Sequence, residues 1–537
     1  MDVSTDGVPH IGQTPARSAS DAVAEPTAAI SECDYPAPLL PEDEWNRQLA
    51  AHVRPRDWVN PRPKDRYHLV VIGGGTAGLV SAAIAATLGA RVALVEKSLL
   101  GGDCLNAGCV PSKALLTTAR AIRMARRFPQ LGLKTPTDIR VDFARVMERM
   151  RRLRAAISPH DSAARFRDLG VDVFIGAGRF IGPDRVQVED ATLRFRKAII
   201  ATGTRPAVPP LPGLQDVHYL TNETVFSLTA LPRRLAVIGA GPIGCEMAQA
   251  FANFGSEVLL IEAMHGVLPR EDREAGGIVQ RALEHDGVRV LCCGKSLHLE
   301  KTGGGARLRV ESHGRCCDQI VDALLVCAGR APNVRGLGLE AAGVAYDEKR
   351  GVHVDDFLRT TNRRIYAAGD VCSPYKFTHA ADFMARIAVR NALFRGRSQF
   401  SRLVIPWCTY TAPELAHVGL TAAAAESRGI AVDVLTQPLD EVDRAVLEEA
   451  TDGFVKVVVR RGTDRILGAT IVAEDAGNMI GELTMALQHG VGLKALAEVI
   501  HPYPTIAEAI RKLGDRYNRT RLTPFAKRLL RWILGRA

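Results

Sequence analysis

The sequence lacks the long apolar segments that membrane insertion and secretion require. No stretch among its 537 residues approaches the roughly 20 consecutive apolar residues that a helix needs to span a bilayer. The N-terminal segment has no apolar run either, and it carries acidic residues that a mitochondrial transit peptide would avoid, namely Asp2, Asp6, Asp21 and Glu25. We therefore expect a cytoplasmic protein.

Aromatic residues are also scarce, at 5% of the chain, although basic residues outnumber acidic ones by 69 to 59. Nucleic-acid modules usually combine a basic face with exposed aromatic side chains, so we expect no nucleic-acid partner. The excess charge is spread over Arg-rich stretches such as 120–127 and 149–154, which we interpret as solvated helix faces. Eleven cysteines without a secretory signal are typical of a reducing compartment rather than of a disulfide scaffold.

Two segments of the chain repeat one pattern that is typical of dinucleotide binding. Each has a buried strand, three glycines at G-x-G-x-x-G spacing, a helix, and a second strand that ends in an acidic residue. The residues are Gly73, Gly75, Gly78 and Glu96 in the first copy and Gly239, Gly241, Gly244 and Glu262 in the second. Such glycines let the backbone approach a pyrophosphate at a helix N-terminus, and the carboxylate accepts ribose hydroxyls. The repetition indicates two Rossmann-type units that bind two different nucleotides.

Between the two units lie two cysteines, Cys104 and Cys109, with four residues between them. At the mouth of a helix this spacing can hold the two sulfurs within disulfide range. A helix N-terminus also favours the thiolate form of a cysteine. The pair therefore indicates redox chemistry, in which one thiol exchanges with a substrate while the other stores charge.

These features divide the chain into consecutive parts of an α/β protein. We expect a first nucleotide-binding domain that is interrupted by a second one, followed by a separate C-terminal domain. The expected parts are a disordered leader and arm (1–65), the first domain (66–214), the inserted domain (215–340), the return to the first domain (341–400), the C-terminal domain (401–515) and a basic tail (516–537).

The ordered motifs resemble those of the flavoprotein pyridine nucleotide-disulfide oxidoreductases, the family of lipoamide dehydrogenase, glutathione reductase and mercuric reductase. The resemblance covers about residues 66–515. Besides the motifs above, it rests on Lys113, Ala201-Thr202-Gly203, Glu246, Gly329-Arg330-Ala331-Pro332-Asn333, Ala368-Gly369-Asp370 and Pro504-Thr505-x-x-Glu508. It implies two Rossmann-type domains, one for FAD and one for NAD(P)H, and a C-terminal α+β dimerisation domain that makes the protein a homodimer.

The resemblance also implies roles for individual residues. Glu96 would hold the adenosine ribose of FAD, and Asp370 its ribityl chain. Lys113 would lie beside the flavin, paired with Glu246 as a buried charge couple. The other cofactor contacts that the resemblance implies are Gly178, Thr202, Gly203 and Gly329.

The second unit would bind the reducing nucleotide. A carboxylate at Glu262 accepts both ribose hydroxyls of NADH and repels a 2′-phosphate, whereas an NADPH enzyme usually places an arginine nearby. The next arginine along the chain is Arg270, so we favour NADH over NADPH. Electrons would pass from the nicotinamide through the flavin to the disulfide. Cys109 would be the sulfur nearer the flavin, and Cys104 the thiol that exchanges with the acceptor.

The sequence departs from the thiol-exchanging members of the family near its C-terminus. Those members carry His-Pro-Thr-x-x-Glu, in which the histidine acts as a base across the dimer and the glutamate orients it. Alignment on Glu508 places Tyr503 at the position of the base, and His501 lies two residues earlier. A tyrosine with a pKa near 10 is a poor base at neutral pH, and mercuric reductase has tyrosine here. His501 would instead make the protein a dihydrolipoamide dehydrogenase, and both alternatives stay open.

The pattern thus favours the mercuric reductase-like branch, with a small-molecule, disulfide or metal-ion acceptor. Mercuric reductases typically add a Cys-x-x-Cys module and a C-terminal vicinal cysteine pair, and the sequence shows neither. Asp103 also replaces the threonine that is usual before the first active cysteine. We interpret the vicinal pairs Cys292-Cys293 and Cys316-Cys317 as structural, and we assign no metal ligand.

The tail 516–537 carries basic residues and no acidic one. Its apolar residues Phe525, Leu529, Trp532 and Ile533 fall on one helical face, which is the pattern of an amphipathic helix attracted to anionic lipid. The alternative is a terminal helix that packs on the body of the dimer. A membrane-recruited flavoprotein scaffold without catalysis is a further alternative, although a scaffold has no need to keep the dithiol and its lysine together.

Overall fold

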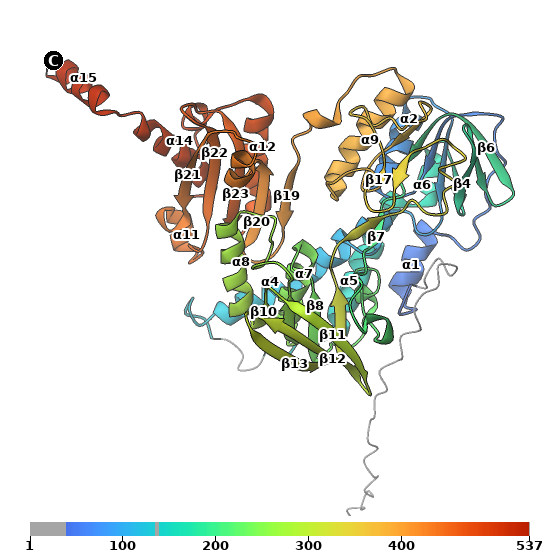
Figure 1. The fold of residues 1–537 in the computed structure, drawn as a ribbon, viewed down its shortest axis with the longest axis horizontal. Coiled ribbons are helices and arrows are strands. Elements are labelled where there is room, and N and C mark those ends of the chain that lie inside the picture. The colour runs from blue at the N-terminus through green and yellow to red at the C-terminus, as the bar shows by residue number, and fades with distance from the viewer. Residues whose placement is uncertain (1–38, 135–138, 536–537) are drawn as a thin grey trace, which may run out of the picture.

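Residues 39–134 and 139–535 are described by the computed structural model, which has three regions (Figure 1). The first nucleotide-binding unit lies at the upper right of this view, the second at the bottom, and the C-terminal sheet at the left. Helices α4 (Cys109–Arg127) and α7 (Pro242–Phe254) pack against each other between these regions. The expected α/β fold with two nucleotide-binding units and an α+β C-terminal region is confirmed.

The sheet of the first unit is built on β1 (Tyr67–Ile72), an apolar run buried on both faces, as is typical of a central parallel strand. It pairs in parallel with β2 and β6, and β18 returns from far along the chain to pair with β6. The other strands of this sheet are β2 (Val92–Glu96), β3 (Val171–Ile175), β4 (Gly178–Gly182), β5 (Arg185–Val188), β6 (Ala191–Ile200) and β18 (Ile365–Ala367).

Helices of the first unit connect these strands and carry the cysteine pair. Helix α2 connects β1 to β2 and packs on α9, and α3 and α4 follow β2. The bounds are α1 (Glu44–Val53), α2 (Thr76–Thr87), α3 (Gly102–Asn106), α5 (Phe143–Ile157), α6 (Ala163–Asp168) and α9 (Thr378–Leu393).

The segment before β1 is docked on the first unit as far as the structure describes it. Trp58 Nε1 donates to the carbonyl of Val173 at 3.1 Å, and Asn60 Nδ2 donates to the carbonyl of Ile175 at 3.0 Å. Residues 39–65 therefore form an ordered arm that includes α1. The remainder of the leader predicted for 1–65 lies outside the described residues.

The second unit has a four-stranded parallel sheet in the order β10-β9-β8-β14. A three-stranded antiparallel sheet, β11 to β13, is inserted in the chain between β10 and β14 and contacts the parallel sheet. The bounds are β8 (Arg234–Ile238), β9 (Glu257–Ile261), α8 (Arg273–His285), β10 (Val288–Leu291), β11 (Lys295–Thr302), β12 (Gly305–Ser312), β13 (Arg315–Val321) and β14 (Ala323–Val326).

The C-terminal region is an antiparallel sheet in the order β19-β20-β23-β22-β21, with α12 packed on β20 and β23. Its elements are β19 (Pro406–Thr409), β20 (Glu414–Gly419), α10 (Ala422–Glu426), β21 (Val432–Pro438), α11 (Asp443–Leu447), β22 (Phe454–Arg460), β23 (Ile466–Ala473), α12 (Ala476–His489), α13 (Leu493–Leu496), α14 (Glu508–Thr520) and α15 (Pro524–Leu534).

Short strands link these regions. The strand β7 (Thr204–Pro206) pairs with β15 (Arg330–Pro332), so the chain leaves and re-enters the first unit along one two-stranded ribbon. A second ribbon joins β16 (Tyr346–Asp347) to β17 (Gly351–Val352). Single 3₁₀ turns lie at 158–161, 214–216, 225–227, 400–402 and 439–441.

The C-terminal helix α15 projects away from the rest of the molecule (Figure 1), and none of its residues is buried. Within the described ranges 39–134 and 139–535, no helix combines the length and the apolar character that crossing a membrane would demand.

Candidate functional site

Glu96 lies at the end of β2, beside the glycine turn of the first unit. Its Oε2 accepts the N–H of Gly74 at 2.5 Å, and its Oε1 accepts the N–H of Ser98 at 2.6 Å. Burial raises the pKa of this carboxyl, and the two backbone donors oppose the rise. The carboxyl group is thereby fixed at the edge of the glycine turn, where a ribose of a bound nucleotide would lie.

Glu262 holds the equivalent position in the second unit, directly after β9. Its Oε2 accepts the N–H of Ala240 at 2.8 Å, and its Oε1 accepts the N–H of Met264 at 2.9 Å. The two donors occupy the same places relative to their motif as the donors to Glu96. The two copies of the sequence pattern thus form two sites in which the acidic residue accepts the same pair of backbone hydrogen bonds.

The three glycines of each motif meet different demands. The first glycines, Gly73 and Gly239, turn the chain with φ of 107° and 100°. At Gly78 and Gly244 an added Cβ would lie 1.7 and 1.9 Å from the carbonyl oxygen of the first glycine, so helix and strand lie too close for a side chain. Gly75 and Gly241 begin α2 and α7, and no side chain caps either helix. These open N-termini fit the pyrophosphate of FAD in the first unit and of a nicotinamide nucleotide in the second.

Asp370 follows β18 and lies among polar partners. Thr204 Oγ1 donates to Asp370 Oδ2 at 3.1 Å and accepts from Arg330 Nε at 2.7 Å, and Lys376 Nζ donates to the Asp370 carbonyl. Burial raises the pKa of the Asp370 carboxyl, against the pull of Arg330 and Lys376. A buried carboxyl group with such neighbours suits a polyol chain such as the ribityl chain of FAD.

The remaining predicted cofactor contacts fall on the loops that end these strands. Thr202 Oγ1 donates to the carbonyl of Asn333 at 2.7 Å, and the N–H of Asn333 donates to the carbonyl of Gly203 at 3.0 Å. Gly178 begins β4 beside β2, and Gly329 precedes β15 with φ of 130°. The loop after β6 is thus hydrogen bonded to the segment that directly follows β15.

The two predicted redox cysteines occupy a helix–turn–helix at the end of β2. Cys104 lies within α3, and Cys109 is the first residue of α4. Gly108 precedes it as the N-cap without a side-chain hydrogen bond, so the helix N-terminus is open toward the Cys109 sulfur. No disulfide bond joins the two cysteines in the structure.

The two thiols differ in acidity because they are hydrogen bonded to each other. This bond lowers the pKa of Cys109 and raises that of Cys104. The hydroxyl of Thr378, whose Oγ1 lies 3.4 Å from the Cys109 sulfur, and the ammonium of Lys113 lower the Cys109 pKa further. Cys109 is therefore the sulfur that the site holds as a thiolate, and Cys104 is its hydrogen-bond donor.

Lys113 and Glu246 form an ion pair one helical turn beyond Cys109. Lys113 Nζ lies 3.1 Å from Oε1 and 2.8 Å from Oε2 of Glu246, and it also lies 4.5 Å from the centre of the Tyr410 ring. The side chain of Glu246 is 4% exposed, whereas that of Lys113 is 38% exposed. The ammonium can therefore face the place expected for the flavin while its counter-ion stays buried.

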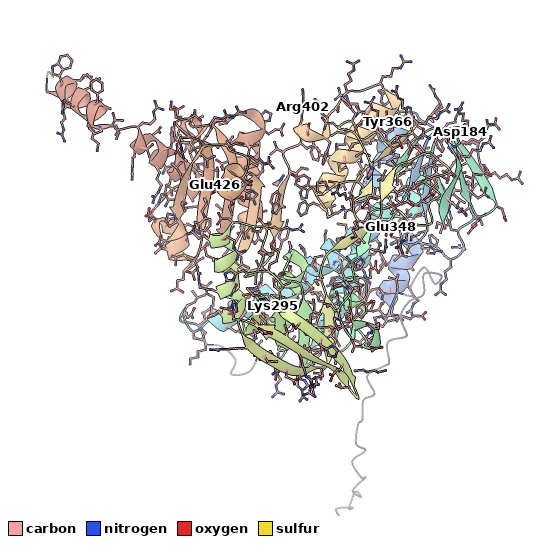
Figure 2. The ribbon with its side chains drawn as sticks, viewed as in Figure 1. Asp184, Lys295, Glu348, Tyr366, Arg402 and Glu426 are labelled. Atoms are coloured by element: carbon pink, nitrogen blue, oxygen red, sulfur yellow. The ribbon has the colours of Figure 1, made fainter. Side chains whose placement is uncertain are left out.

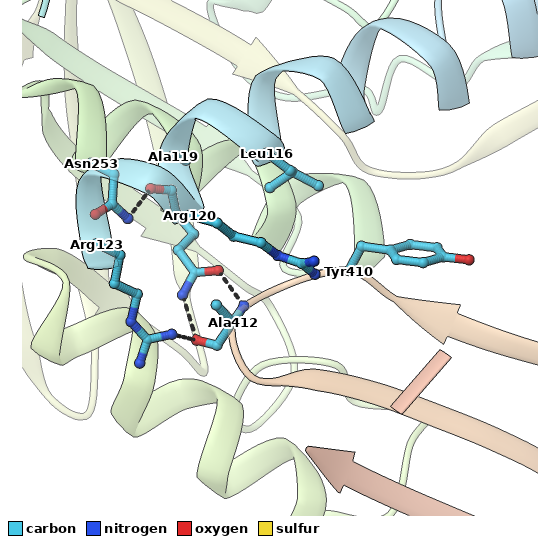
Figure 3. A pocket seen from close by; sticks show the side chains of 8 residues that line it. Leu116, Ala119, Arg120, Arg123, Asn253, Tyr410 and Ala412 are labelled. Atoms are coloured by element: carbon cyan, nitrogen blue, oxygen red, sulfur yellow. Dashed lines mark hydrogen bonds between the residues drawn. The ribbon is translucent and has the colours of Figure 1, made fainter. Parts of the chain in front are cut away.

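A small pocket beside this pair shows how the three regions are fastened together (Figure 3). Gln249 Nε2 donates to the carbonyl of Ala412 at 2.8 Å, and Gln249 Oε1 accepts the N–H of Ala412 at 2.8 Å. Arg123 of α4 donates to the same carbonyl, and Arg120 pairs with Glu414. The C-terminal region is thereby fixed to α4 and α7 next to the redox pair.

Asp103, which replaces the usual threonine before Cys104, forms an ion pair with Arg330. Arg330 also donates to the hydroxyl and the carbonyl of Thr204. The substitution therefore connects the redox helix–turn–helix to the ribbon of β7 and β15.

The side chain of His501 is largely shielded from solvent by its own subunit. Its Nε2 lies 3.2 Å from Oε2 of Glu482 on α12, its Nδ1 lies 3.1 Å from the carbonyl of Val499, and its side chain is 7% exposed. An imidazole held on both nitrogens within its own subunit is poorly placed to exchange protons with a substrate.

Tyr503 faces outward from this loop, with 72% of its surface exposed. Its hydroxyl donates to Asp443 Oδ2 at 2.9 Å, and this bond raises the pKa of the phenol, so the group is protonated at neutral pH. Glu508, at the start of α14, pairs with Arg511 at 2.7 Å. The glutamate that would orient a catalytic histidine is therefore engaged elsewhere.

Two residues of the site were not predicted from the sequence. Thr378 contacts Cys109 from 269 residues away, and no local motif marks it. Tyr410 donates its N–H to Glu246 Oε1 at 3.0 Å in addition to its contact with Lys113. The stretch around Tyr410 was assigned to dimerisation, and a sequence pattern could not show that it also lines the redox pair.

Comparison with known proteins agrees with this geometry. A family model described as "Pyridine nucleotide-disulphide oxidoreductase" matches residues 67–385, and the model of that family's dimerisation domain matches 405–513. A mercuric reductase from Bacillus cereus is 34% identical over 485 residues, 90% of this chain and 76% of its own. A dihydrolipoyl dehydrogenase from Thermus scotoductus is 35% identical over 456 residues, 84% of this chain and 97% of its own.

Solved structures give the same result. The HOCl-induced flavoprotein disulfide reductase RclA from Escherichia coli, in a Cu(II) complex, matches with a TM-score of 0.74 and 30% identity, over 84% of this chain and 99% of that one. LpdA from Mycobacterium tuberculosis matches with a TM-score of 0.76 and 28% identity over the same shares. With its two nucleotide-binding units, its paired thiols and its C-terminal domain, this chain belongs to the pyridine nucleotide-disulfide oxidoreductases, FAD-dependent enzymes that use pyridine nucleotides.

Proposed function

We propose that this enzyme uses NADH to reduce a thiophilic metal ion through the Cys104–Cys109 pair, as a mercuric reductase does. The observation that carries the proposal is the contrast between Tyr503 and His501. The phenol is exposed on the surface of the C-terminal domain, and the imidazole is buried against Glu482. A neutral phenol is a weak base but a suitable neighbour for a metal ion that is passed between thiolates.

The chain's own groups perform the thiol chemistry. Bound FAD would accept a hydride from the reduced nicotinamide and supply the electron pair that opens the disulfide. Lys113 and Glu246 hold a positive charge beside the place where this occurs, and the helix N-terminus with Thr378 stabilises the Cys109 thiolate. Cys104 then exchanges with the acceptor.

The electrons of this reaction balance. Opening the S–S bond takes two electrons and leaves both sulfurs reduced. The reduced dithiol then binds Hg(II), which would take two electrons supplied by NADH through bound FAD, and elemental mercury leaves while both sulfurs stay reduced. The net reaction consumes one NADH and one Hg(II) and yields NAD⁺, Hg(0) and one proton.

NADH rather than NADPH is the proposed reductant. The carboxylate of Glu262 is held by two backbone N–H groups at the end of β9, where the ribose hydroxyls of a bound dinucleotide would lie. A 2′-phosphate at this position would meet a fixed negative charge.

The protein is proposed to act as a homodimer, since it carries the dimerisation domain of its family. In this assembly the exposed Tyr503 of one subunit would complete the site of its partner. Within its own subunit, the phenol of Tyr503 is held by its hydrogen bond to Asp443.

Dihydrolipoamide dehydrogenase activity is the alternative, and relatives with that name match at a similar identity. The contact between His501 and Glu482 argues against it, because the imidazole would first have to leave Glu482. A scaffold without catalysis is also disfavoured. The chain retains the dithiol together with Lys113, which contacts Glu246 and acts electrostatically on Cys109.

The test is anaerobic NADH oxidation by the purified enzyme, with lipoamide in one cuvette and thiol-complexed Hg(II) in the other. We expect turnover with Hg(II), at least about 10-fold slower turnover in Tyr503→Phe, and little change in His501→Gln. Turnover with lipoamide alone, abolished in His501→Gln, would assign the enzyme to the dihydrolipoamide dehydrogenases. No turnover with either acceptor would remove both proposals.

We also propose peripheral contact between α15 and anionic membranes. The helix carries Lys527, Arg528 and Arg531, its apolar side chains are exposed, and it projects from the body of the protein (Figure 1). Basic charge next to an apolar face is the combination that binds anionic lipid surfaces.

A further inference from the structure

The second nucleotide-binding unit contains a cluster of metal-ligating side chains that is separate from the dithiol. It consists of Cys292, Cys293, His265 and His313, and one donor atom of each lies within 4.8 Å of all the others. The sequence interpretation treated the cysteine pair as structural and assigned no metal ligand. The fold brings two histidines to the two sulfurs of this pair, an arrangement that the sequence interpretation did not include.

The four side chains come from three separate segments. His265 lies in the loop after β9, the cysteines lie between β10 and β11, and His313 lies in the turn between β12 and β13. Lys295, labelled in Figure 2, begins β11 and marks this place in the second unit. Three loops thus converge on one point and bring these four side chains together.

The distances agree with a tetrahedral ion. The Cys292 sulfur lies 3.2 Å from Nε2 of His313, and the Cys293 sulfur lies 3.5 Å from Nδ1 of His265. Bond lengths of about 2.3 Å to sulfur and about 2.0 Å to nitrogen give a sulfur–nitrogen separation of roughly 3.5 Å in a tetrahedron. The two imidazole rings are nearly perpendicular, with centroids 6.2 Å apart, so each ring can aim one nitrogen at a common centre.

The backbone adopts left-handed conformations at two of these residues. Cys293 has φ of 56° and His313 has φ of 50°. In an extended chain neighbouring side chains point to opposite faces, and the left-handed turn at Cys293 breaks this alternation so that both sulfurs lie on one side. A residue other than glycine is strained in this conformation, and ligation would offset that strain.

The two cysteines of the cluster are held in place by hydrogen bonds, and its two histidines face solvent. Cys292 is buried, and its carbonyl accepts the hydroxyl of Ser312 at 2.6 Å. The N–H of Cys293 donates to the carbonyl of Met264 at 2.9 Å. Both histidines are exposed, so a metal ion can enter from solvent and then meet thiols fixed in place.

We propose that Cys292, Cys293, His265 and His313 form a binding site for one thiophilic d¹⁰ metal ion, with Zn²⁺ as the ion that best suits two thiolates and two imidazoles. The two thiolates neutralise the charge of the ion and release their protons when it binds. The site does not depend on the proposed acceptor of the enzyme, because the dithiol lies in the other nucleotide-binding unit.

The test uses the full FAD-loaded enzyme with Cys104 and Cys109 both replaced by serine, so that the dithiol cannot bind the probe. Anaerobic titration with Co²⁺ should give one bound ion per chain. Visible bands of tetrahedral cobalt should appear at wavelengths longer than those the flavin absorbs, and Zn²⁺ should bleach them. The variant Cys316→Ser, in the neighbouring vicinal pair, is the matched control and should titrate like its parent.

A variant at the hairpin turn separates ligation from folding. His313 and Gly314 form a two-residue turn with positive φ at both positions, and Asn-Gly is a preferred pair for such a turn. His313→Asn should therefore keep the melting temperature while it weakens Co²⁺ binding by at least about 10-fold. Cys292→Ser and Cys293→Ser should each lose the tetrahedral bands.

Three results would overturn the proposal. These are no Co²⁺ bands in the parent, bands that survive in both Cys292→Ser and Cys293→Ser, and unchanged affinity in His313→Asn with an unchanged melting temperature. Any of them would make the sulfur–imidazole contacts ordinary hydrogen bonds of the loops. Failure of Hg(II) turnover would leave this test unaffected.

Discussion

Lys113 of α4 and Glu246 of α7 join the two nucleotide-binding units by an ion pair in which Nζ lies 3.1 and 2.8 Å from the two carboxylate oxygens. The C-terminal domain adds the N–H of Tyr410 to the same carboxylate at 3.0 Å. All three regions of the chain therefore meet at one buried acidic group. Whatever moves one region relative to another also moves the charge beside the dithiol.

Replacement of Lys113 by methionine should affect both stability and the reduction of the disulfide. Glu246 would stay buried with one backbone donor, and because Lys113 is 38% exposed we expect a loss of about 1–2 kcal/mol, less than for a fully buried pair. Reduction of the Cys104–Cys109 disulfide by NADH should slow by about 10- to 100-fold. Urea unfolding and rapid-quench thiol titration measure the two effects.

The double variant Lys113→Met with Glu246→Gln separates these effects. It removes the buried charge, so we expect stability to recover while reduction stays slow. Lys349→Met, at an exposed position of the first unit, is the matched control. Unchanged reduction kinetics in Lys113→Met would show that the ion pair is structural.

The Cys109 thiolate should persist below the pH at which an ordinary cysteine is protonated. Its pKa is lowered, so as the pH falls the thiolate remains through the usual thiol range near about 8.5 and is lost only further down. The ultraviolet thiolate absorbance of the reduced enzyme, taken as the difference from Cys109→Ser, should follow this course.

Thr378→Val should move that transition to higher pH, because it removes the hydroxyl 3.4 Å from the sulfur. Thr378→Ser keeps the hydroxyl and should titrate like the parent. If parent and Thr378→Val both titrate near about 8.5, the assignment of the thiolate to Cys109 is wrong.

Glu262 should set the preference for NADH. In Glu262→Ser the fixed carboxylate is gone, so we expect kcat/KM for NADH to fall and the ratio of NADPH to NADH kcat/KM to rise by about 10-fold, or about 1.4 kcal/mol. Glu257→Ser, at the exposed start of β9, is the control. Steady-state kinetics with both nucleotides give the ratio, and an unchanged ratio would place the discrimination elsewhere.

Deletion of 523–537 should abolish cosedimentation with anionic vesicles. We expect neither the parent nor the deletion variant to bind neutral vesicles. Since no residue of α15 is buried, the melting temperature should not change. A parent protein that stays in the supernatant with anionic vesicles would rule out membrane contact. A deletion that instead lowers dimer stability would show that α15 packs on the partner subunit.

Much of the fold was predictable because the motifs that specify it are local. The glycines of each Rossmann unit and the acidic residue after the next strand lie within one strand–helix–strand unit. Helix α2 must approach β1 closely at Gly78, and Glu96 must end the adjacent parallel strand. The chemistry of Cys104 and Cys109 is local as well, since a helix start fixes their spacing.

Other parts of the site were beyond sequence reasoning because they depend on packing between distant segments. The choice between His501 and Tyr503 is an example, since both lie in one loop. The position of Glu482 on α12 buries the imidazole, and the phenol is left outside. Thr378 likewise reaches Cys109 through the packing of α9 on the first unit.

The sequence by itself determined the two nucleotide-binding units and the family, and it predicted the redox pair, because the residues of each lie at short, fixed spacings along the chain. Only the tertiary structure decided that His265 and His313 meet Cys292 and Cys293. Three loops separated along the chain bring these groups together, and their meeting depends on how β9, β10 and the β12–β13 hairpin pack. No local pattern encodes that arrangement.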